Sequence, residues 1–203
     1  MIANLLNADQ REALQEIANI GMGQAGDSIA RVMGEFVQLS IPRILALERA
    51  EAGAKIAATV GGGAVDAVRQ AFHNQLRGEA IVIYGHDRCN DLADLLGYHG
   101  NIDHAVEQEL LLDVTNLLVG ACLGGIAEQL KADVGFSPPA LMAERVPIET
   151  LLGSDGIDWQ CVLLVEVNFR LEGRSFACHL LILLSGEDVG SLRQALDRFL
   201  EAF

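Results

Sequence analysis

Apolar residues recur at spacings of three and four along two long stretches of the chain, residues 8–34 and 103–131. This spacing places them on one face of an α-helix, so each stretch is predicted to form a long amphipathic helix. Asn7 can cap the first helix, with Gln10 three residues later as its capping-box partner. The apolar positions are Leu14, Ile17, Ala18, Gly21, Ala25, Ile29 and Val32 in the first stretch, and Leu111, Val114, Leu118, Cys122, Ile126 and Leu130 in the second.

Shorter apolar runs, typical of strands, fill much of the remaining chain. An extended segment follows each long helix, the first at residues 36–47 through Pro42 and the second through Pro139. A short helix is expected at residues 90–96. The other predicted elements are strands at residues 65–72 and 79–84, a hairpin of strands at 161–170 and 176–184, and a closing helix at 187–200.

The order of these elements repeats at an offset of 97 residues. Asn116 follows Asn19 by 97 positions, and Pro139 follows Pro42 by the same number. A fixed offset of this kind is the sign of an internal repeat. Further pairs at the same offset are Leu14 and Leu111, Gly23 and Gly120, Ile29 and Ile126, and Phe72 and Phe169.

The repeat predicts the fold class and the domain organisation. Two copies of a helix–strand–strand–strand–helix unit would span about residues 8–97 and 103–203. No charged or Pro/Ser-rich linker separates them, so we expect one domain over residues 1–203. The predicted fold is α/β, of the α+β type, with pseudo-twofold symmetry. Two long helices would pack with a six-stranded, mostly antiparallel sheet.

Composition and charge narrow the range of partners. The 203 residues are 51% hydrophobic, which is enough apolar content to form a folded core. There are 28 Asp and Glu residues against 14 Lys and Arg, for a formal net charge of −14. This excess argues against nucleic acid and anionic membrane surfaces as partners, because both are polyanions.

The sequence also indicates a compartment. The N-terminal residues lack the basic and apolar regions of a signal peptide, and the longest apolar runs are far below the roughly 20 residues of a membrane helix. The four cysteines lie far apart with no CxxC pair and are interpreted as reduced thiols used in the core. We therefore predict a cytoplasmic protein. The cysteines are Cys89, Cys122, Cys161 and Cys178.

Residues 21–26 match the pattern G-x-G-x-x-G through Gly21, Gly23 and Gly26. A dinucleotide-binding loop requires a strand directly before the first glycine, whereas residues 13–20 continue the helical pattern. Each glycine inside a helix costs about 0.5–1 kcal/mol relative to alanine, so these glycines need another reason. Close approach of a second backbone is the better explanation. The nucleotide-binding alternative predicts a strand-to-helix loop at residues 21–26.

A polar motif lies off the apolar stripe of each long helix. In the first helix Glu16 and Asn19 are three residues apart, on one face, and Gly23 leaves the surface beside Asn19 bare. A solvated helix face would explain one such copy, but two copies at one offset favour a site. The second copy is Asp113, Asn116 and Gly120.

The motif resembles the signature of the CheC/CheX/FliY phosphatases of bacterial chemotaxis. Glu16-x-x-Asn19 is followed by 22 residues and then Pro42, and the flanking residues 14–23 are similar to the first helix of that family. The stretch at residues 136–139 is similar to the family's second half. Two copies resemble the CheC-type arrangement more than the CheX type, which is expected to carry one.

The second copy departs from the family pattern more than the first. Its acid is Asp113 rather than Glu, which is one methylene shorter and tends to bond nearby backbone. In both copies the residue four positions before the acid is a glutamate, Glu12 or Glu109, where the family often has Asp or Ser. The first site is therefore expected to be the stronger one.

The resemblance implies an enzyme that dephosphorylates phospho-CheY, a response regulator carrying an aspartyl phosphate. The amide of Asn19, or of Asn116, would hold a water in line with the phosphorus. Glu16 would dock against the regulator's active-site lysine, and action as a general base is the alternative. Gly23 and Gly120 would let the partner's loops come close. The chain itself would need no cofactor or metal, because Mg²⁺ would belong to the partner.

Other readings of the same residues stay open. A non-catalytic module on this fold would bind a response regulator, a flagellar switch or a CheD-like deamidase. His104 and Glu107 share a helix face, and Glu109 lies near Asp113 and Asn116, but a solvated acidic face is favoured over a metal site. Residues 89–130 contain no Lys or Arg, so the acidity is densest around the second helix.

Overall fold

In the computed structural model, the described residues are 5–60, 63–85, 92–93, 96–153, 161–171, 177–186 and 188–202. Both long helices form where the apolar spacing predicts them, as α1 (Ala8–Met33) and α4 (His104–Leu130). α1 begins with the predicted capping box, in which the Gln10 amide N–H donates to Asn7 Oδ1 at 2.8 Å. Asp103 Oδ1 caps α4 by accepting from the Val106 amide at 3.0 Å.

The described strands form one sheet in which every recorded pairing is antiparallel. Its order is β1-β7-β8-β4-β3-β5, with β2 also pairing with β7 and β6 also pairing with β3. The strands are β1 (Val37–Leu39), β2 (Arg43–Glu48), β3 (Ala64–Asn74), β4 (Gly78–Gly85), β5 (Val134–Phe136), β6 (Ala140–Pro147), β7 (Cys161–Leu171) and β8 (Ala177–Ser185).

Among the described residues, the sheet has eight strands rather than the six predicted. Each extended segment after a long helix breaks into two strands at proline, at Pro42 between β1 and β2 and at residues 138–139 between β5 and β6. Proline has no N–H to donate to a ladder, so pairing is interrupted there. Because both parts pair with the same neighbour, the sheet keeps six ladder positions. The α+β class and the antiparallel sheet are confirmed.

The pairing is symmetric about the two central strands. β1 pairs with β7 through Leu39 and Phe169, and β5 pairs with β3 through Phe136 and Phe72. These two pairs are related by the offset of 97 residues found in the sequence. β4 and β8 pair with each other at the centre, where Ile81 lies opposite Leu181. The strands of the first half therefore occupy places in the sheet that correspond to those of the second.

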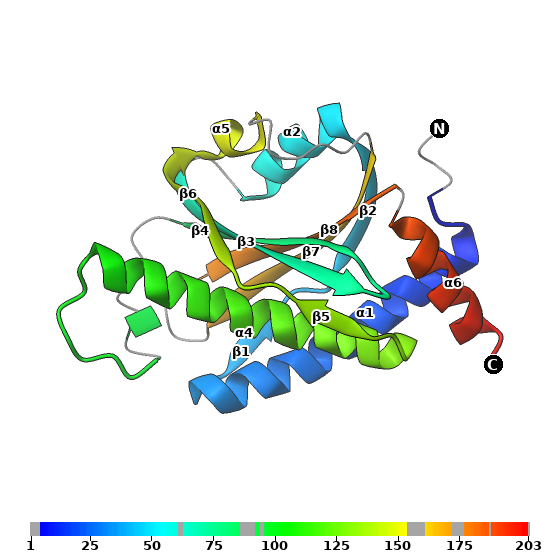
Figure 1. Cartoon of the computed structure of the whole chain (residues 1–203), viewed down its shortest axis with the longest axis horizontal. Helices are drawn as coiled ribbons and strands as arrows, with labels where there is room; N and C mark the ends of the chain where they lie inside the picture. The colour runs from blue at the N-terminus through cyan, green and yellow to red at the C-terminus, as the bar shows by residue number, and fades with distance from the viewer. Residues whose placement is uncertain are drawn as a thin grey trace.

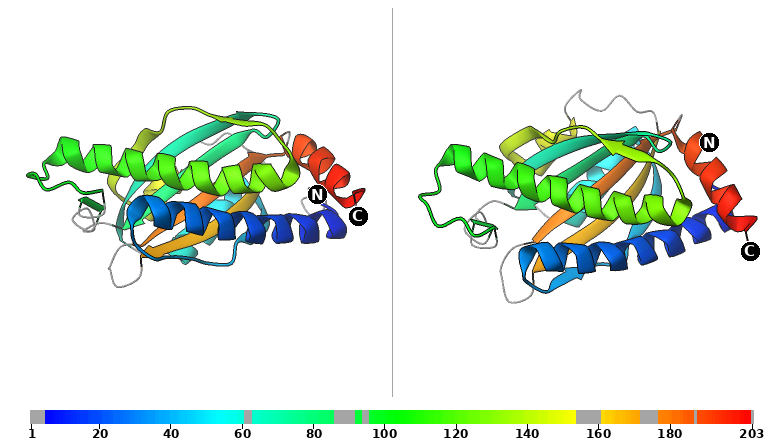
Figure 2. Two further views of the ribbon diagram at one scale, coloured as in Figure 1. Left: turned by 90° about the horizontal axis from the view of Figure 1, so that it is seen from below. Right: turned by 60° about the horizontal axis from the view of Figure 1, so that its bottom comes forward.

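The helices lie on both faces of the sheet. α1 and α4 run antiparallel, side by side, across one face (Figure 2). The opposite face carries α2 (Arg49–Val60) and α5 (Ile148–Gly153), which the sequence pattern did not predict (Figure 1). The closing helix is α6 (Val189–Leu200), which packs against α1. Of the short helix expected at residues 90–96, most lies outside the described residues, but Leu92 and Ala93 are helical.

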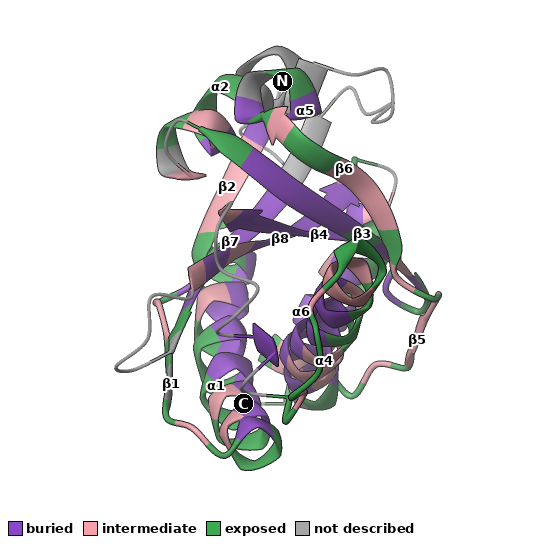
Figure 3. Cartoon of the chain, turned by 90° about the vertical axis from the view of Figure 1, so that its left-hand side faces the viewer, coloured by how far each residue is buried: buried purple, intermediate pink, exposed green. Residues whose placement is uncertain are grey.

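A hydrophobic core lies on each side of the sheet, and Figure 3 marks the buried residues of the strands and helices in purple. The larger one lies between the sheet and α1, α4 and α6, and the smaller one lies under α2 and α5. All the predicted apolar positions of the two long helices are buried except Val32, which is 63% exposed. Met33 is buried instead. Because an α-helix has 3.6 residues per turn, the residue four positions after Ile29 lies on the same face as Ile29.

α4 is long and apolar enough to cross a membrane by length and composition alone. In the fold its most apolar window is 61% buried. Its side chains Leu111, Val114 and Leu118 belong to the larger core, together with residues of α1 and the sheet. This burial is the behaviour of a core helix.

Gly21 and Gly125 lie where the backbones of α1 and α4 meet. A Cβ on Gly21 would lie 2.8 Å from the carbonyl carbon of Gly125, which is closer than side chains pack. The expectation that a second backbone approaches the helical glycines is thus confirmed at Gly21. Residues 21–26 lie in the middle of a continuous helix, so the strand-to-helix loop required for nucleotide binding is absent there.

Candidate functional site

The two copies of the polar motif lie on exposed surfaces of the long helices. Glu16, Asn19 and Gly23 are exposed on α1. A Cβ added to Gly23 would meet nothing within 4 Å, in contrast to Gly21 two residues earlier. Gly23 therefore has no packing reason within the described chain, and the surface beside Asn19 is open. The helix periodicity that buries Leu14 and Ile17 is what turns the motif outward.

The second copy is likewise exposed at its acid and its asparagine. Asp113 and Asn116 are exposed on α4, and Gly120 is half-buried. A Cβ on Gly120 would also meet nothing within 4 Å. The two motifs lie on neighbouring antiparallel helices that cover the same face of the sheet (Figure 2).

Asn19 is connected to the proline of its motif through a glutamine. Gln15, one helical turn earlier, donates from Nε2 to the Pro42 carbonyl oxygen at 2.8 Å and to Asn19 Oδ1 at 3.4 Å. The second of these bonds is long, and Gln15 is only half-buried. This contact offers a reason for the spacing between Asn19 and Pro42. The chain that follows α1 must be long enough to return to the helical turn that carries Gln15 and Asn19.

Asn116 is held by a different glutamine, which comes from the sheet. Gln70 of β3 donates from Nε2 to Asn116 Oδ1 at 2.8 Å and to the Ser137 carbonyl oxygen at 2.9 Å. Ser137 is itself fixed, because its amide N–H donates to the Ala71 carbonyl oxygen at 2.9 Å. The side chain of Gln70 is 2% exposed. Sequence reasoning missed Gln15 and Gln70, and only Gln15, one turn from Asn19 on the same helix, left a signal in the sequence.

A groove of about 420 Å³ opens beside Asn19, between α1 and the chain that leads to β2. Gly23 and Asp27 lie on its helical side, and Phe36 and Ile41 lie on the other. Phe36 is 63% exposed and Ile41 is 75% exposed, so the rim of the groove is apolar. Exposed apolar groups of this size around a concave surface are typical of a binding site.

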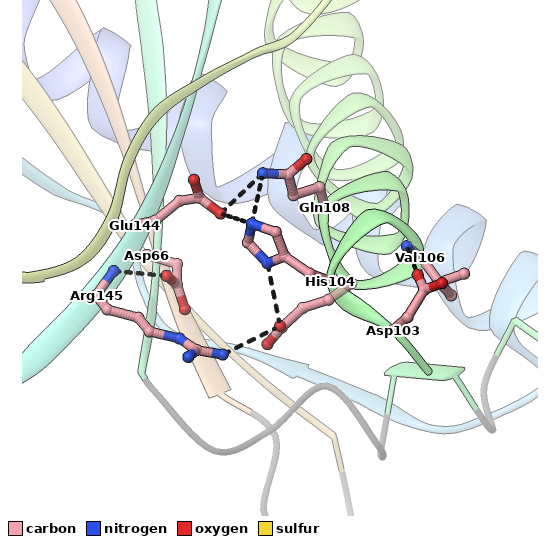
Figure 4. Close-up of polar contacts among 8 residues, drawn as sticks. Asp66, Asp103, His104, Val106, Gln108, Glu144 and Arg145 are labelled. Carbon is pink, nitrogen blue, oxygen red and sulfur yellow. Dashed lines mark hydrogen bonds and ion pairs between the residues drawn. The ribbon is translucent and has the colours of Figure 1, made fainter. Parts of the chain in front are cut away.

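His104 and Glu107, one pair that the sequence suggested as alternative metal ligands, make ionic contacts with β6 instead. His104 Nε2 lies 3.3 Å from Glu144 Oε1, and Arg145 reaches Glu107 Oε2 at 3.4 Å (Figure 4). The Arg145 amide N–H donates to Asp66 Oδ1 at 2.9 Å. The first two contacts join the start of α4 to β6, and the third joins β6 to β3. Within the described ranges, no group of three or more His, Cys, Asp or Glu residues is placed to hold a metal ion.

The titratable groups with shifted pKa values lie away from the motifs. Burial raises the pKa of the Cys122 thiol to about 12 and raises that of Cys178 well above its usual value, and Cys122 adds to the second shift. Both thiols are free, buried and unreactive core groups, as predicted. Cys89 and the side chain of Cys161 lie outside the described residues. Burial also lowers the pKa of His179, which Glu166 partly opposes.

Comparison with known proteins gives matches in structure only. No protein-family model and no curated protein sequence matches the chain. FliY from Thermotoga maritima is 17% identical, with a TM-score of 0.72 over 96% of this chain and 98% of that one. The FliM middle domain from H. pylori is 11% identical, with a TM-score of 0.61 over 94% and 99%. CheX from Desulfovibrio desulfuricans is 13% identical, with a TM-score of 0.54 over 82% and 99%. The chain therefore has the fold of the CheC/CheX/FliY group of chemotaxis and flagellar proteins, the group that its motif resembles.

Proposed function

We propose that the chain is a CheC-like phosphatase that hydrolyses the aspartyl phosphate of a phosphorylated, CheY-like response regulator. The observation that carries the proposal is the doubled motif on exposed helix faces, with the Oδ1 atom of each asparagine bonded to a glutamine. When Oδ1 accepts a bond from the protein, the Nδ2 group is left to donate outward. The fold likeness to FliY and CheX supports the same assignment.

The chemistry requires little of this chain. A water attacks phosphorus, the bond between phosphorus and the aspartyl oxygen breaks, and the carboxylate leaves with the bonding electrons while both protons of the water end on the phosphate. An acyl phosphate is already activated, so the catalyst must mainly align the water and manage charge. The Asn19 or Asn116 amide would align the water. Mg²⁺ bound to the regulator would neutralise the phosphoryl oxygens.

The surroundings of Asn19 suit docking of such a partner. Glu16 is exposed three residues before Asn19 and would pair with the regulator's lysine. The apolar rim at Phe36 and Ile41 offers area to bury. The net charge of −14 repels free phosphate but attracts a partner that presents a lysine and Mg²⁺ around its phosphoryl group.

The test is release of inorganic phosphate from a phosphorylated response regulator, with and without the chain, over a panel of regulators. The proposal expects the chain to accelerate the decay of at least one regulator in a saturable manner. Decay that never exceeds that of the regulators alone would refute the enzymatic assignment.

The second candidate is a non-catalytic binding module, for a regulator, a flagellar switch or a CheD-like deamidase. It is favoured by one finding, the likeness to FliM, because FliM of H. pylori is also known in a complex with SpeE. A binding module would associate with its partner without changing the lifetime of the aspartyl phosphate. Binding measured on the same regulators therefore separates the two candidates.

A further inference from the structure

We propose that Gln70 is a positioning residue for the second site, which fixes the Asn116 amide so that its Nδ2 group faces the approaching phosphoryl group and its water. The proposal rests on the proposed function and deepens it. It assigns to the sheet, and not only to the helix, a part in building the site.

The hydrogen bonds of Gln70 determine the plane of its amide. Its Nε2 group has two hydrogens, and both are used, one for Asn116 Oδ1 at 2.8 Å and one for the Ser137 carbonyl oxygen at 2.9 Å. Ser137 is tied to β3 through the Ala71 carbonyl. The bond to the fixed Ser137 carbonyl sets the orientation of the Gln70 amide, and the Asn116 amide must then present Oδ1 to the second Nε2 hydrogen. Nδ2 of Asn116, which has no partner among the described residues, is directed outward.

The other end of the same side chain is poorly satisfied. Gln70 Oε1 is buried and has no hydrogen-bond partner within the described part of the chain. A buried acceptor without a partner destabilises a fold, and an apolar side chain of similar length would avoid this cost. Gln70 is thus a poor residue for packing but a suitable one for holding Asn116. A residue that lowers stability in this way is typical of a functional position.

The corresponding position in the other half shows that the arrangement is not a general need of the fold. By the offset of 97 residues, Gln70 corresponds to Val167, and Gln15 corresponds to Leu112. Asn19 is therefore supported by a glutamine of its own helix, and Asn116 by a glutamine from a strand of the first half. Only at Asn116 does the support come from a buried strand residue with a short bond.

The experiment uses Gln70→Met in a background of Asn19→Ala, so that only the second site contributes to phosphate release. The expected result is a roughly tenfold lower kcat with little change in KM, because the amide is misoriented rather than removed. The melting temperature is expected to stay the same or to rise. If Gln70 has only a structural role, its replacement should lower the melting temperature and leave kcat unchanged. That result would overturn the proposal. Gln70→Leu serves as a second variant.

A double-mutant cycle shows whether Gln70 acts through Asn116. In the Asn19→Ala background, Gln70→Met should have no further effect on the residual rate once Asn116→Ala is also present. Equal losses with and without Asn116 would contradict the proposed coupling. The matched control is Gln15→Met, which is expected to alter the Asn19 site alone.

A second readout keeps the proposal independent of the phosphatase activity. Nitrogen-15 relaxation of the Asn116 side-chain amide reports its order in the intact chain. Gln70→Met should make this amide mobile, and Gln15→Met should not. If the wild-type chain accelerates no regulator, the proposed function fails while this measurement still decides the positioning role. An Asn116 amide that is equally ordered in both variants would overturn it.

Discussion

The Asn19 and Asn116 sites carry the same motif but are built by different means. At the first, Gln15 of the same helix makes a bond of 3.4 Å to the asparagine, and an apolar groove lies beside it. At the second, Gln70 of the sheet makes a bond of 2.8 Å. The residues that correspond by the repeat to Val32, Phe36 and Ile41 of the first half are Gln129, Asp133 and Pro138 in the second.

The difference separates two requirements of the proposed reaction. The first site offers apolar surface and a glutamate, which favours docking of a partner. The second offers an asparagine whose amide is held in one orientation, which favours catalysis after docking. The sequence ranked the second site lower because Asp113 is shorter than Glu, but the length of the acid says nothing of how the asparagine is supported. We therefore expect docking and turnover to respond differently to changes at the two sites.

Among single substitutions, the largest expected effect comes from the two asparagines. Asn116→Ala should lower kcat roughly tenfold and Asn19→Ala by only about a tenth, because the Asn116 amide is the better oriented of the two. Saturation kinetics of phosphate release from a responsive regulator measure both. A larger kcat loss from Asn19→Ala would reverse the ranking of the sites.

Alanine substitutions at two glycines of α1, Gly21 and Gly23, should change the free energy of unfolding in opposite directions. Gly21→Ala places a methyl group 2.8 Å from the Gly125 backbone and should lower the free energy of unfolding by about 1–3 kcal/mol. Gly23→Ala fills open space and should raise it by about 0.5–1 kcal/mol. Gly120→Ala, at the second site, is the matched control and should behave as Gly23→Ala does. Urea titrations of the three variants decide this, and equal shifts for Gly21 and Gly23 would contradict the packing described.

The rim of the groove should affect docking at the first site only. Ile41→Asp should raise KM roughly fivefold with kcat nearly unchanged, because it replaces exposed apolar surface with a charge. Pro138→Asp, at the corresponding exposed position of the second half, is the control and should leave KM close to that of the wild type. Equal effects of the two substitutions would show that the groove has no special part in docking.

The smallest effect concerns pH and the loop of the first site. His179 Nδ1 lies 2.5 Å from Asn168 Oδ1, and the Asn168 amide N–H donates to Ser40 Oγ in the segment before Pro42. Burial lowers the pKa of folded His179 below its ordinary value of 6.5, so the unfolded chain binds the proton more readily. Stability from this group is therefore present above pH 6.5 and is lost as the pH falls toward the lower, folded pKa.

Melting temperatures of the wild type and of His179→Gln at pH 7.5 and 5.5 measure this contribution. The melting temperature of the wild type is expected to fall more on acidification than that of the variant. The same loss in both proteins would assign the pH dependence to other groups.

Much of the scaffold could be predicted from the sequence because it depends on local patterns. The bounds of α1 and α4, the capping box at Asn7 and the outward face of Asn19 all follow from helical periodicity and end signals. The hairpin of β7 and β8 follows from two apolar runs. The sequence correctly predicted that Pro42 and Pro139 lie in extended segments. It did not predict that each segment divides into two strands, because this depends on how the segment pairs with its neighbouring strand.

The rest depends on contacts between distant parts of the chain. Gln70 and Asn116 are 46 residues apart, and their bond requires both the register of β3 and the rotation of α4 about its axis. Gly125 was not recognised as the partner of Gly21 for the same reason. α2 follows β2 directly, and its apolar residue Ile56 reveals its packing face only once the sheet beneath it is known.

The central claim is that the two asparagines perform the dephosphorylation, and the double variant Asn19→Ala/Asn116→Ala tests it most directly. The measurement is the decay rate of a phosphorylated regulator that the wild type accelerates, at a saturating concentration of each protein, with binding of the regulator measured in parallel. The account predicts that the acceleration falls at least roughly 100-fold while the double variant still binds the regulator. A double variant that binds and still accelerates the decay as the wild type does would contradict it.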